Sequence, residues 1–543
     1  MKAGDMIKVR VDEEGRGSFQ LPPEGAGSSP RFALAEFLAR HGFPLNTRCG
    51  GRGLCNGCEV LLSDSAAVKA CAFPLENFRE RERATTITIP RRSLLRQQPS
   101  VVDDFRVNIP MARDPLAPDA RLGAAIDIGT TTVAVLLCDL ENGKTLARAS
   151  AFNAQMRHGE DVITRIEFCR AGGMTAVREL QRAIAGGTIQ PLLDEVCAKA
   201  GATRADIGVA VVAGNTTMQH LLAGENPAPL GAHPFTPVFL ETRSLAARGA
   251  GLEFGAPGGN GNGGARVHLL PGLSSYVGAD IAAGLVATGM IYDEGPSLLI
   301  DVGTNGEIVA KAGGRLAGCA TAAGPAFEGA GLSCGTRAVR GAVERIRLGA
   351  NPFEARLDII GGNNASRQPT GLCGSAYVDF LWEARRAGLL MSNGRFVASE
   401  KLSTDARGGK KLRLGPDSGP DSLSISEQDI ARLLQAKAAI GAGMQTLLAA
   451  LGIAPRDVRR VYLAGGFGMR LSLEHAIGCG LLPGFEPAQI QIVGNTSLAG
   501  AYLAMNDRSL LAEMQSLRAR FEPVELNLQP GFEDTFIDNL ALP

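Results

Sequence analysis

Four cysteines gather in one short region of the chain and could bind a metal. Their spacing is Cys49-x5-Cys55-x2-Cys58-x12-Cys71, and the first three lie in the stretch RCGGRGLCNGCEVLL. Four thiolates can hold zinc or an iron–sulfur cluster, but structural zinc sites usually use two closely spaced cysteine pairs. Only Cys55 and Cys58 form such a pair here. The glycines between the cysteines permit tight turns with N–H groups aimed at sulfur, so the pattern favours a 2Fe-2S cluster over zinc or plain buried cysteines.

The other seven cysteines are scattered singly along the chain, and we interpret each as a small buried hydrophobic residue. They are Cys138, Cys169, Cys197, Cys319, Cys334, Cys373 and Cys479. Eleven cysteines with this distribution do not indicate a disulfide framework.

A second group of candidate residues comes from a motif that occurs twice. Residues 124–130 read AAIDIGT and residues 298–304 read LLIDVGT, so an apolar strand ends each time in Asp and is followed by Gly-Thr. An aspartate at a strand end can hold a hydrated Mg²⁺ ion. A Gly-Thr turn offers N–H groups and a hydroxyl to phosphate oxygens. Two such turns that face each other could therefore grip a triphosphate from both sides.

A third element, RVYLAGGFG at residues 460–468, reads as a strand that ends in Gly465-Gly466 and lets an adenosine approach the backbone. Other nucleotide motifs fit less well. A Walker A loop ending in Gly143-Lys144-Thr145 would need glycine where Cys138 stands. A G-x-G-x-x-G match at positions 259, 261 and 264 lies in a glycine-rich stretch with no strand before it and no helix after it. The remaining alternative is that all three elements are strands with ordinary turns.

The elements that position these residues form several units, because 543 residues are too many for one core. Residues 1–89 read as a small α+β unit, with strands at 6–11, 17–21, 58–62 and 85–89 and a helix whose apolar face carries Leu34, Phe37 and Leu38. Residues 90–120 are rich in proline and read as a linker, with one short helical piece at LLRQQ. Residues 121–290 and 291–543 alternate strands with helices, which predicts an α/β pattern in two similar halves. The helices are expected near 160–170, 279–288, 374–387 and 426–451.

The overall charge limits the function classes. Lys and Arg number 55, Asp and Glu also number 55, and the net charge is therefore zero. A nucleic-acid-binding protein would usually carry a basic excess. No run of about 18 apolar residues and no secretory signal are found, so we expect a cytoplasmic protein without a membrane span.

The cysteine loop, with the strands and helix before it, resembles ferredoxins of the plant and adrenodoxin type. The short spacing to Cys71 departs from free plant ferredoxins and is a feature of ferredoxin domains built into larger proteins. The two Asp-x-Gly-Thr turns, followed by the strand and Gly-Gly-Phe, resemble the phosphate-1, phosphate-2 and adenosine motifs of the actin, Hsp70 and sugar-kinase superfamily. The combination resembles the reductive activators of corrinoid enzymes. The stretches that carry this resemblance are 127–132, 214–218, 276–280, 301–307, 323–330, 371–375, 463–468 and 494–497.

The resemblance implies a multidomain α+β and α/β fold: a β-grasp 2Fe-2S ferredoxin-like domain, a linker, and a duplicated actin-like, ribonuclease-H-like ATPase domain. It implies ATP-dependent passage of one electron from the cluster to Co(II), which regenerates Co(I) on a corrinoid protein of a methyltransferase system. A homodimer is expected. The implied cluster ligands are Cys49, Cys55, Cys58 and Cys71. The implied catalytic residues are Asp127, Asp301 and Glu328, with Mg²⁺ at the aspartates. The implied ATP-binding residues are Gly129, Thr130, Thr131, Thr132, Gly303, Thr304, Asn305, Gly465, Gly466 and Phe467.

Three alternatives remain at this level. The chain could be a small-molecule kinase of the same superfamily with a redox-sensing ferredoxin domain. It could be an electron-transfer module on a vestigial ATPase scaffold, although both turns keep their Asp and Thr residues. An activator of 2-hydroxyacyl-CoA dehydratases usually carries a 4Fe-4S cluster between subunits, and the N-terminal ferredoxin-like loop argues against that class.

Overall fold

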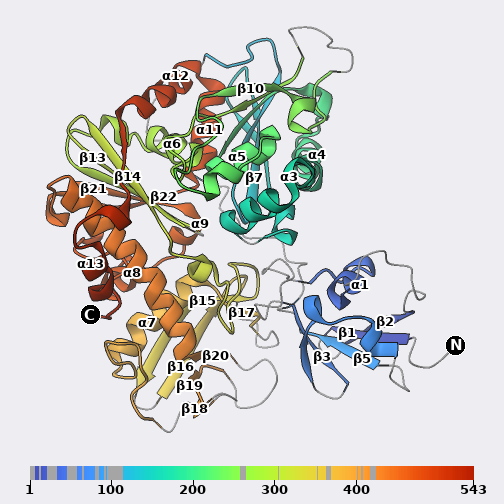
Figure 1. Ribbon diagram of the computed structural model, residues 1–543, viewed down its shortest axis with the longest axis vertical. Coiled ribbons are helices and arrows are strands. Elements are labelled where there is room, and N and C mark those ends of the chain that lie inside the picture. Colours follow the sequence, from blue (N-terminus) through green and yellow to red (C-terminus); the bar gives the residue numbers. More distant parts are fainter. Residues whose placement is uncertain are drawn as a thin grey trace.

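The computed structural model in Figure 1 shows an N-terminal sheet followed by a much larger α/β assembly. The residues that it describes are 6–11, 14–20, 33–45, 58–63, 66–79, 85–90, 93, 105, 114–159, 161–256, 264–303, 305–350, 353–362, 369–399, 402–404, 408–415 and 423–543.

The N-terminal sheet has five strands in the order β2-β1-β5-β3-β4, with β1 parallel to β5 and the other pairs antiparallel. Alternate residues of β1, such as Ile7 and Val9, are buried while Lys8 between them is exposed, so one face of the sheet packs on α1. The predicted strands and helix are confirmed, and β4 and the short helix α2 were missed. The elements are β1 (Met6–Val11), β2 (Glu14–Gln20), α1 (Leu34–Arg40), β3 (Glu59–Leu62), β4 (Ala67–Lys69), α2 (Glu76–Arg79) and β5 (Thr85–Ile89).

The first large sheet contains the first Asp-x-Gly-Thr turn. Its strand order is β10-β11-β9-β6-β7-β8, and β6 runs antiparallel to β7 and parallel to β9. Successive residues of β6 face opposite sides: Ile126 packs toward α3 and α4, whereas Ala125 packs toward α6 and α11. The elements are β6 (Leu122–Ile128), β7 (Thr132–Asp139), β8 (Thr145–Phe152), α3 (Val162–Ile184), α4 (Gln190–Ala200), β9 (Ile207–Gly214), α5 (Thr216–Ala223), β10 (Arg243–Ala246) and β11 (Arg266–Leu269).

The second large sheet repeats this plan. Its order is β22-β21-β12-β13-β14-β23, and β12 lies between an antiparallel β13 and a parallel β21, as β6 lies between β7 and β9. The sequence repeat therefore marks two strand pairs with equivalent neighbours in the two sheets. The strands are β12 (Ser297–Val302), β13 (Gly306–Ala312), β14 (Arg315–Thr321), β21 (Arg460–Ala464), β22 (Ile490–Gly494) and β23 (Phe521–Pro523).

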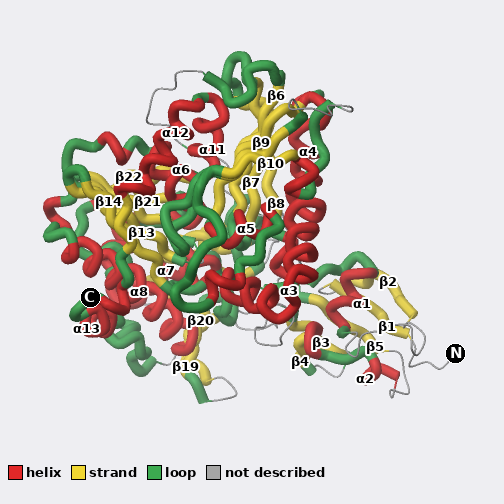
Figure 2. The backbone as a smooth tube through the Cα atoms, turned by 45° about the horizontal axis from the view of Figure 1, so that its top comes forward, coloured by secondary structure: helices red, strands yellow, loops and turns green. Residues whose placement is uncertain are grey.

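Two helices lie between the large sheets, α6 (Ala279–Ala287) and α11 (Thr496–Asn506), as Figure 2 shows. They cross very closely, because a Cβ atom at Gly500 would lie 2.4 Å from the Cβ atom of Ala283. Glycine at this position permits the approach. The helix pair therefore joins the two halves through one shared apolar core.

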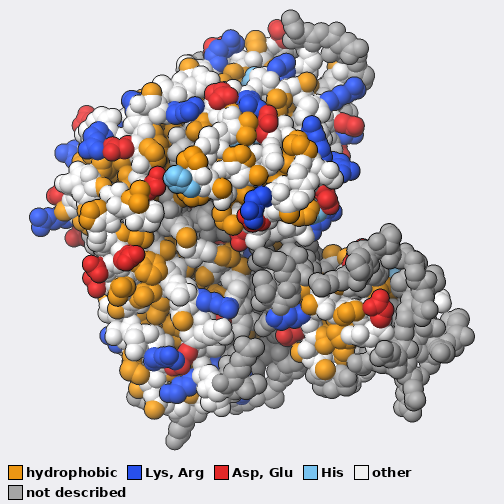
Figure 3. Space-filling model, in the orientation of Figure 1, with side chains coloured by type: hydrophobic (Ala, Val, Ile, Leu, Met, Phe, Trp, Pro, Cys, Tyr) orange, Lys and Arg blue, Asp and Glu red, His pale blue; other side chains and the backbone are white. Residues whose placement is uncertain are grey.

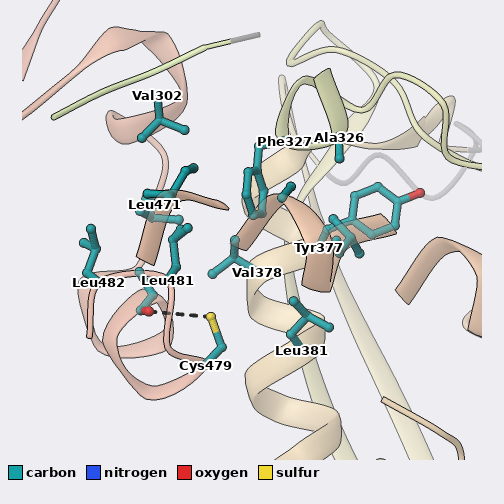
Figure 4. Packing of buried hydrophobic residues seen from close by; sticks show 14 of the residues in the cluster. Val302, Ala326, Phe327, Tyr377, Val378, Leu381, Leu471, Cys479, Leu481 and Leu482 are labelled. Carbon is teal, nitrogen blue, oxygen red and sulfur yellow. Dashed lines mark hydrogen bonds between the residues drawn. The ribbon is translucent and has the colours of Figure 1, made fainter. Parts of the chain in front are cut away.

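Most of the remaining elements pack on the second large sheet and build the lower part of the molecule in Figure 1, whereas α12 (Arg508–Leu517) lies at the top, against α6 and α11. They form two three-stranded sheets, ordered β16-β15-β17 and β18-β19-β20. Figure 4 shows Val378 and Leu381 of α7 in the apolar core, with Phe327 and Val302 nearby. The elements are β15 (Ala342–Ala350), β16 (Phe353–Ile359), β17 (Gly371–Leu372), α7 (Gly374–Arg386), β18 (Leu402–Thr404), β19 (Lys410–Arg413), β20 (Ser424–Ser426), α8 (Glu427–Ala450), α9 (Gly465–Gly468), α10 (Leu473–Gly478), α12 (Arg508–Leu517) and α13 (Phe532–Asp538). The four predicted helices correspond to α3, α6, α7 and α8, although α3 is much longer than expected.

The predicted linker is described in part, and that part contacts the core. The Leu116 amide donates to the Met505 carbonyl at 3.0 Å, and the Arg508 amide donates to the Asp114 carbonyl at 2.9 Å. The Phe105 ring lies 5.8 Å from that of Tyr502, centroid to centroid. The predicted helical piece LLRQQ lies outside the described residues. The C-terminal end of the linker therefore packs along α11 and α12.

On the face shown in Figure 3, basic and acidic side chains are interspersed, in keeping with the zero net charge. Within the described ranges, no helix is both long and apolar enough to cross a membrane.

Candidate functional site

One cavity of about 250 Å³ brings the repeated turns and the Gly-Gly turn together. It lies at the carboxyl ends of β6, β12 and β21, where the chain leaves each strand. The predicted residues that line it are Asp127, Gly129, Thr130, Thr131, Thr132, Asp301, Gly303, Asn305, Glu328, Gly465, Gly466 and Phe467. Thr304, which was also predicted, lies outside the described residues.

The first turn is closed tightly. The Gly129 amide donates to the Thr132 carbonyl at 2.9 Å, and a Cβ atom at Gly129 would lie only 2.6 Å from the oxygen of that carbonyl. The Asn153 side-chain amide donates to the Gly129 carbonyl at 2.9 Å, and that of Asn215 donates to the Thr130 hydroxyl at 3.0 Å. The hairpin is thus fixed by neighbouring elements, which leaves its hydroxyl groups at the cavity wall.

Asp127 is bound by residues from the other half of the molecule. The Asn495 side-chain amide donates to one carboxylate oxygen at 2.8 Å, and the Ser497 hydroxyl donates to the other at 2.7 Å. Asn495 is the N-cap of α11, and its own side-chain oxygen accepts from the Leu498 amide at 2.8 Å. The start of α11 therefore positions the first aspartate.

The second turn is more open. The Gly303 amide donates to the Asn305 carbonyl at 2.9 Å, but a Cβ atom at Gly303 would meet nothing closer than 3.8 Å. Gly465, with φ at +86°, starts α9 beside this turn, and a Cβ atom there would lie 2.6 Å from Asp301 Oδ1. Only glycine permits β21 to turn this close to the second aspartate.

Four partly buried acids line the cavity, and their charged forms are disfavoured. Burial, and then the charge of Asp301, raise the pKa of Asp280 to about 7. Burial, and then the charges of Asp127 and Glu328, raise the pKa of Asp301 to about 7. Burial raises the pKa of Asp127 against its two hydrogen bonds, and burial with the nearby Asp280 raises that of Glu307 well above its ordinary value. A cation in the cavity would relieve this strain among like charges.

The acids do not form a complete metal cage by themselves. In the described part of the chain, no group of three or more His, Cys, Asp or Glu side chains could hold a metal ion. Mg²⁺ is usually bound through one or two carboxylates, with waters and substrate phosphates completing its octahedron. Asp127 and Asp301 could hold the ion in this way.

Glu328 faces the same cavity and connects its two sides. The Thr131 hydroxyl donates to the Glu328 carboxylate at 3.1 Å, from the first half to the second. The preceding residue, Phe327, places its ring 5.2 Å from that of Phe467, centroid to centroid. These apolar rings lie next to the Gly465-Gly466 turn, where the sequence predicts the adenosine.

Several residues at the cavity were not predicted as site residues. They include Asn215, Asp280, Glu307, Asn495 and Ser497, together with Arg337, Cys373, Gly374, Ser375 and Arg470. A signal existed for two of them, because Gly-Asn-Thr occurs twice, at 214–216 and 494–496, and asparagine is a typical helix N-cap. Arg337 and Arg470 have no such signal.

The cysteines of the N-terminal region are described in part. Cys49 and Cys55 lie outside the described residues. Cys58, directly before β3, is fully buried in the core of the N-terminal sheet, and Cys71 packs against that core. The Ala70 amide donates to the Cys58 carbonyl at 3.1 Å, which places the segments of both cysteines side by side. Of the seven scattered cysteines, six are buried as predicted and Cys334 is partly exposed.

Comparison with known proteins gives consistent matches along the chain. Residues 122–293 match the RACo middle region, and residues 295–543 match the C-terminal domain of RACo, the ASKHA domain. The corrinoid activation enzyme RamQ of Eubacterium limosum is 28% identical over 599 aligned positions, which cover 96% of this chain and 98% of that protein. The [Co(II) methylated amine-specific corrinoid protein] reductase of Methanosarcina barkeri is 30% identical over 260 residues, or 45% of each chain.

A solved structure agrees with these matches. The reductive activator for corrinoid, iron-sulfur protein superposes with a TM-score of 0.70 at 29% identity, and the match covers 99% of this chain and 98% of that one. The full-length relative and the solved structure are both named for the activation of corrinoid proteins, and both family models describe regions of RACo. The chain belongs to the family of reductive activators of corrinoid proteins.

Proposed function

We propose that this protein uses ATP to pass one electron from an N-terminal 2Fe-2S cluster to the Co(II) of a corrinoid protein, which regenerates Co(I). The observation that carries this proposal is that both Asp-x-Gly turns and the Gly-Gly turn line the same cavity. The four-cysteine pattern in the same chain adds an electron carrier. An electron transfer that requires energy needs both parts. The cluster carries the electron, and the nucleotide site supplies the energy.

The energetics give ATP a role. Plant-type 2Fe-2S clusters have reduction potentials near about −400 mV. A corrinoid Co(II)/Co(I) couple that lies about 100 mV lower would make transfer of one electron unfavourable by about 2.3 kcal/mol. A ligand that binds two conformations differently can shift their equilibrium by several kcal/mol. ATP binding between the two halves would supply such a shift.

Each part of the cavity has a role in this proposal. Asp127 and Asp301 hold the Mg²⁺ ion that accompanies ATP and orient the attacking water. Gly129, Gly303 and the hydroxyl groups of the first turn contact phosphates. The ion, when bound, neutralises phosphate charge.

Three further groups complete the site. Gly465, Gly466 and Phe467 lie along the adenosine, and Thr304 and Asn305 belong to the second phosphate turn. Glu328 faces the bound nucleotide in this proposal, because it lines the cavity and lies near enough to Asp301 to raise the pKa of that residue.

The 2Fe-2S ligands are Cys49, Cys55, Cys58 and Cys71 in this proposal. The order β2-β1-β5-β3-β4 with α1 packed on one face supports a β-grasp, ferredoxin-like domain. Cys58 and Cys71 lie on neighbouring segments of this domain, as ligands of one cluster must. The proposed domains are the ferredoxin-like domain 1–89, the linker 90–120, and the ATPase halves 121–290 and 291–543.

The partner in this proposal is the corrinoid protein of a methyltransferase system, and the active form is a homodimer in the cytoplasm. A small-molecule kinase has less support, because the similar proteins that span nearly the whole chain are named for corrinoid activation.

The test is anaerobic. The purified protein should contain about two irons and two sulfides per chain, and Cys58→Ser should lose them while Cys197→Ser, a buried cysteine of α4, keeps them. With reductant and a Co(II) corrinoid protein, formation of Co(I) should require ATP, which the Co(I) absorption band reports. One zinc and no sulfide would contradict the cluster, and phosphorylation of a metabolite without any corrinoid protein would favour the kinase.

A further inference from the structure

Arg337 reaches across the nucleotide cavity from one half of the molecule to the other. It lies between η10 (Pro325–Glu328) and β15, in the second half, and lines the cavity. Its guanidinium carbon stands 4.6 Å from the ring centroid of Phe152, the last residue of β8 in the first half. Its terminal nitrogen lies 3.7 Å from the sulfur of Met156. The side chain is thus held against an aromatic face of the opposite half.

The contacts of Phe152 fix which end of the cavity Arg337 reaches. The next residue, Asn153, donates its amide N–H to the Thr131 carbonyl at 2.9 Å and its side-chain N–H to the Gly129 carbonyl at 2.9 Å. Arg337 therefore stands beside the first phosphate turn. The Gly465-Gly466 turn, where the adenosine is proposed, follows β21 in the second half, the half that also contains Arg337.

The loop that carries Arg337 is held in place before any ligand binds. The Thr336 amide donates to the Leu372 carbonyl at 2.9 Å. The Ser333 amide donates at 2.8 Å to Asp429, which is buried at the start of α8. A guanidinium on a fixed loop loses little conformational freedom when it binds an anion, and its planar donors match phosphate oxygens.

The second arginine at the cavity is placed differently. Arg470 forms an ion pair with Glu344 of β15, so a carboxylate of its own half already balances its charge. Arg337 faces a cavity with five acids, and a triphosphate there needs cations besides Mg²⁺. We infer that Arg337 binds the terminal phosphate of the nucleoside triphosphate from across the cleft, so that the protein distinguishes ATP from ADP. This inference rests on the proposed ATP site.

Binding can be measured without turnover. Isothermal titration calorimetry of the full-length protein with Mg²⁺ would compare a non-hydrolysable ATP analogue with ADP. Arg337→Gln should weaken binding of the analogue at least about tenfold, because charge-assisted hydrogen bonds are lost, and should change ADP binding by less than about threefold. Arg337→Lys, which keeps the charge but not the planar fork, should fall between Gln and wild type. The matched control is Arg340→Gln, an exposed arginine three residues along the same segment that does not line the cavity.

Phe152→Leu tests the same contact from the other half and leaves Arg337 intact. It should weaken binding of the analogue more than binding of ADP, which keeps the inference testable if Arg337→Gln does not fold. Equal loss of both nucleotides, or no loss in either variant, would overturn the role of Arg337 while wild type still binds ATP. Failure of the wild-type protein to bind the analogue at all would instead overturn the proposed ATP site.

Discussion

The two Asp-x-Gly turns are equivalent in topology but differ in their surroundings. Each follows a central strand, β6 or β12, with an antiparallel neighbour on one side and a parallel neighbour on the other. Asp127 accepts hydrogen bonds from Asn495 and Ser497 of the opposite half. Among the described residues, no side chain donates a hydrogen bond to Asp301, whose neighbours Asp127 and Glu328 are both acids.

This difference separates two roles that the sequence repeat cannot distinguish. The hydrogen bonds from Asn495 and Ser497 hold the first carboxylate in one orientation. They lower its pKa, although burial raises it by more. Among the described residues, the charges that act on the second carboxylate are those of Asp127 and Glu328, so a cation is the partner that would stabilise its charged form. From this comparison we expect the charged form of Asp301 to depend on a bound cation more strongly than that of Asp127 does.

The largest expected effect follows from removing the second carboxylate. Asp301→Asn keeps the shape of the side chain and removes its charge, so ATP hydrolysis should fall at least about a hundredfold. Phosphate release measures this loss, and the visible absorption of the cluster should remain unchanged because the N-terminal sheet has its own core.

The matched variant at the first turn is Asp127→Asn. It should also impair hydrolysis, but in addition it disrupts the bonds from Asn495 and Ser497, so its melting temperature should fall while that of Asp301→Asn should not. Normal hydrolysis in both variants would show that the phosphates bind elsewhere, and equal melting shifts would contradict the difference between the turns.

The glycines give the next largest contrast. A Cβ atom at Gly129 would lie 2.6 Å from the Thr132 carbonyl oxygen, whereas one at Gly303 would lie 3.8 Å from its nearest neighbouring atoms. Gly129→Ala should therefore lower the free energy of unfolding by about 1–3 kcal/mol, the usual result of forcing atoms into a packed region. Gly303→Ala should lower it by less than about 0.5 kcal/mol. Urea titrations of both variants against wild type would measure the difference, and similar losses would show that the two turns are equally tight.

Much of the fold and of the cavity could be predicted, because short-range patterns carry them. Asp127, Asp301 and Gly465 lie at the ends of apolar strands, and each strand end can be recognised within about ten residues. Asn495 was missed as a site residue because its partner, Asp127, lies far away in the chain. Nothing in the sequence near residue 495 tells which half its side chain will face. Arg337 was missed for a similar reason, since its position depends on Phe152 of the opposite half.

The pH dependence of Mg²⁺ binding provides a smaller test of the same contrast. The pKa of Asp301 and that of Asp280 are both raised to about 7, so both carboxyl groups are largely protonated at pH 6. Their protons then compete with the cation for the same oxygen atoms. Affinity for Mg²⁺ with ATP should rise about tenfold from pH 6 to pH 7, with release of protons on binding. Calorimetry in buffers of different ionisation enthalpy would measure both. The dependence should flatten in Asp301→Asn, and an unchanged slope in that variant would contradict the assignment.

Asp280 and Asp301 also affect the stability of the fold. Rising pH should lower the free energy of unfolding, whereas it should raise the affinity for Mg²⁺. Their pKa values in the folded protein lie above the ordinary value of 3.8, so the folded state holds its protons to a higher pH than the unfolded state. Without Mg²⁺, the free energy of unfolding should decrease as pH rises from about 4 through about 7. Added Mg²⁺ with ATP should reverse much of this decrease, because it binds the deprotonated, folded form.

The smallest expected effect concerns the bond that joins the first turn to the second half. The Thr131 hydroxyl donates to Glu328 at 3.1 Å across the cavity, and no equivalent bond leads from the second turn to the first among the described residues. Thr131→Val keeps the shape of the side chain and removes one hydrogen bond to a charged group, which should lower the free energy of unfolding by about 1–2 kcal/mol. ATP binding should change only about two- to fivefold, since the backbone N–H groups of the turn remain. Thr132→Val, the neighbouring residue in β7, is the control and should leave stability closer to wild type. If Thr131→Val weakened ATP binding a hundredfold, the hydroxyl would be a principal phosphate ligand, and the first turn would rely on side chains as much as on its backbone.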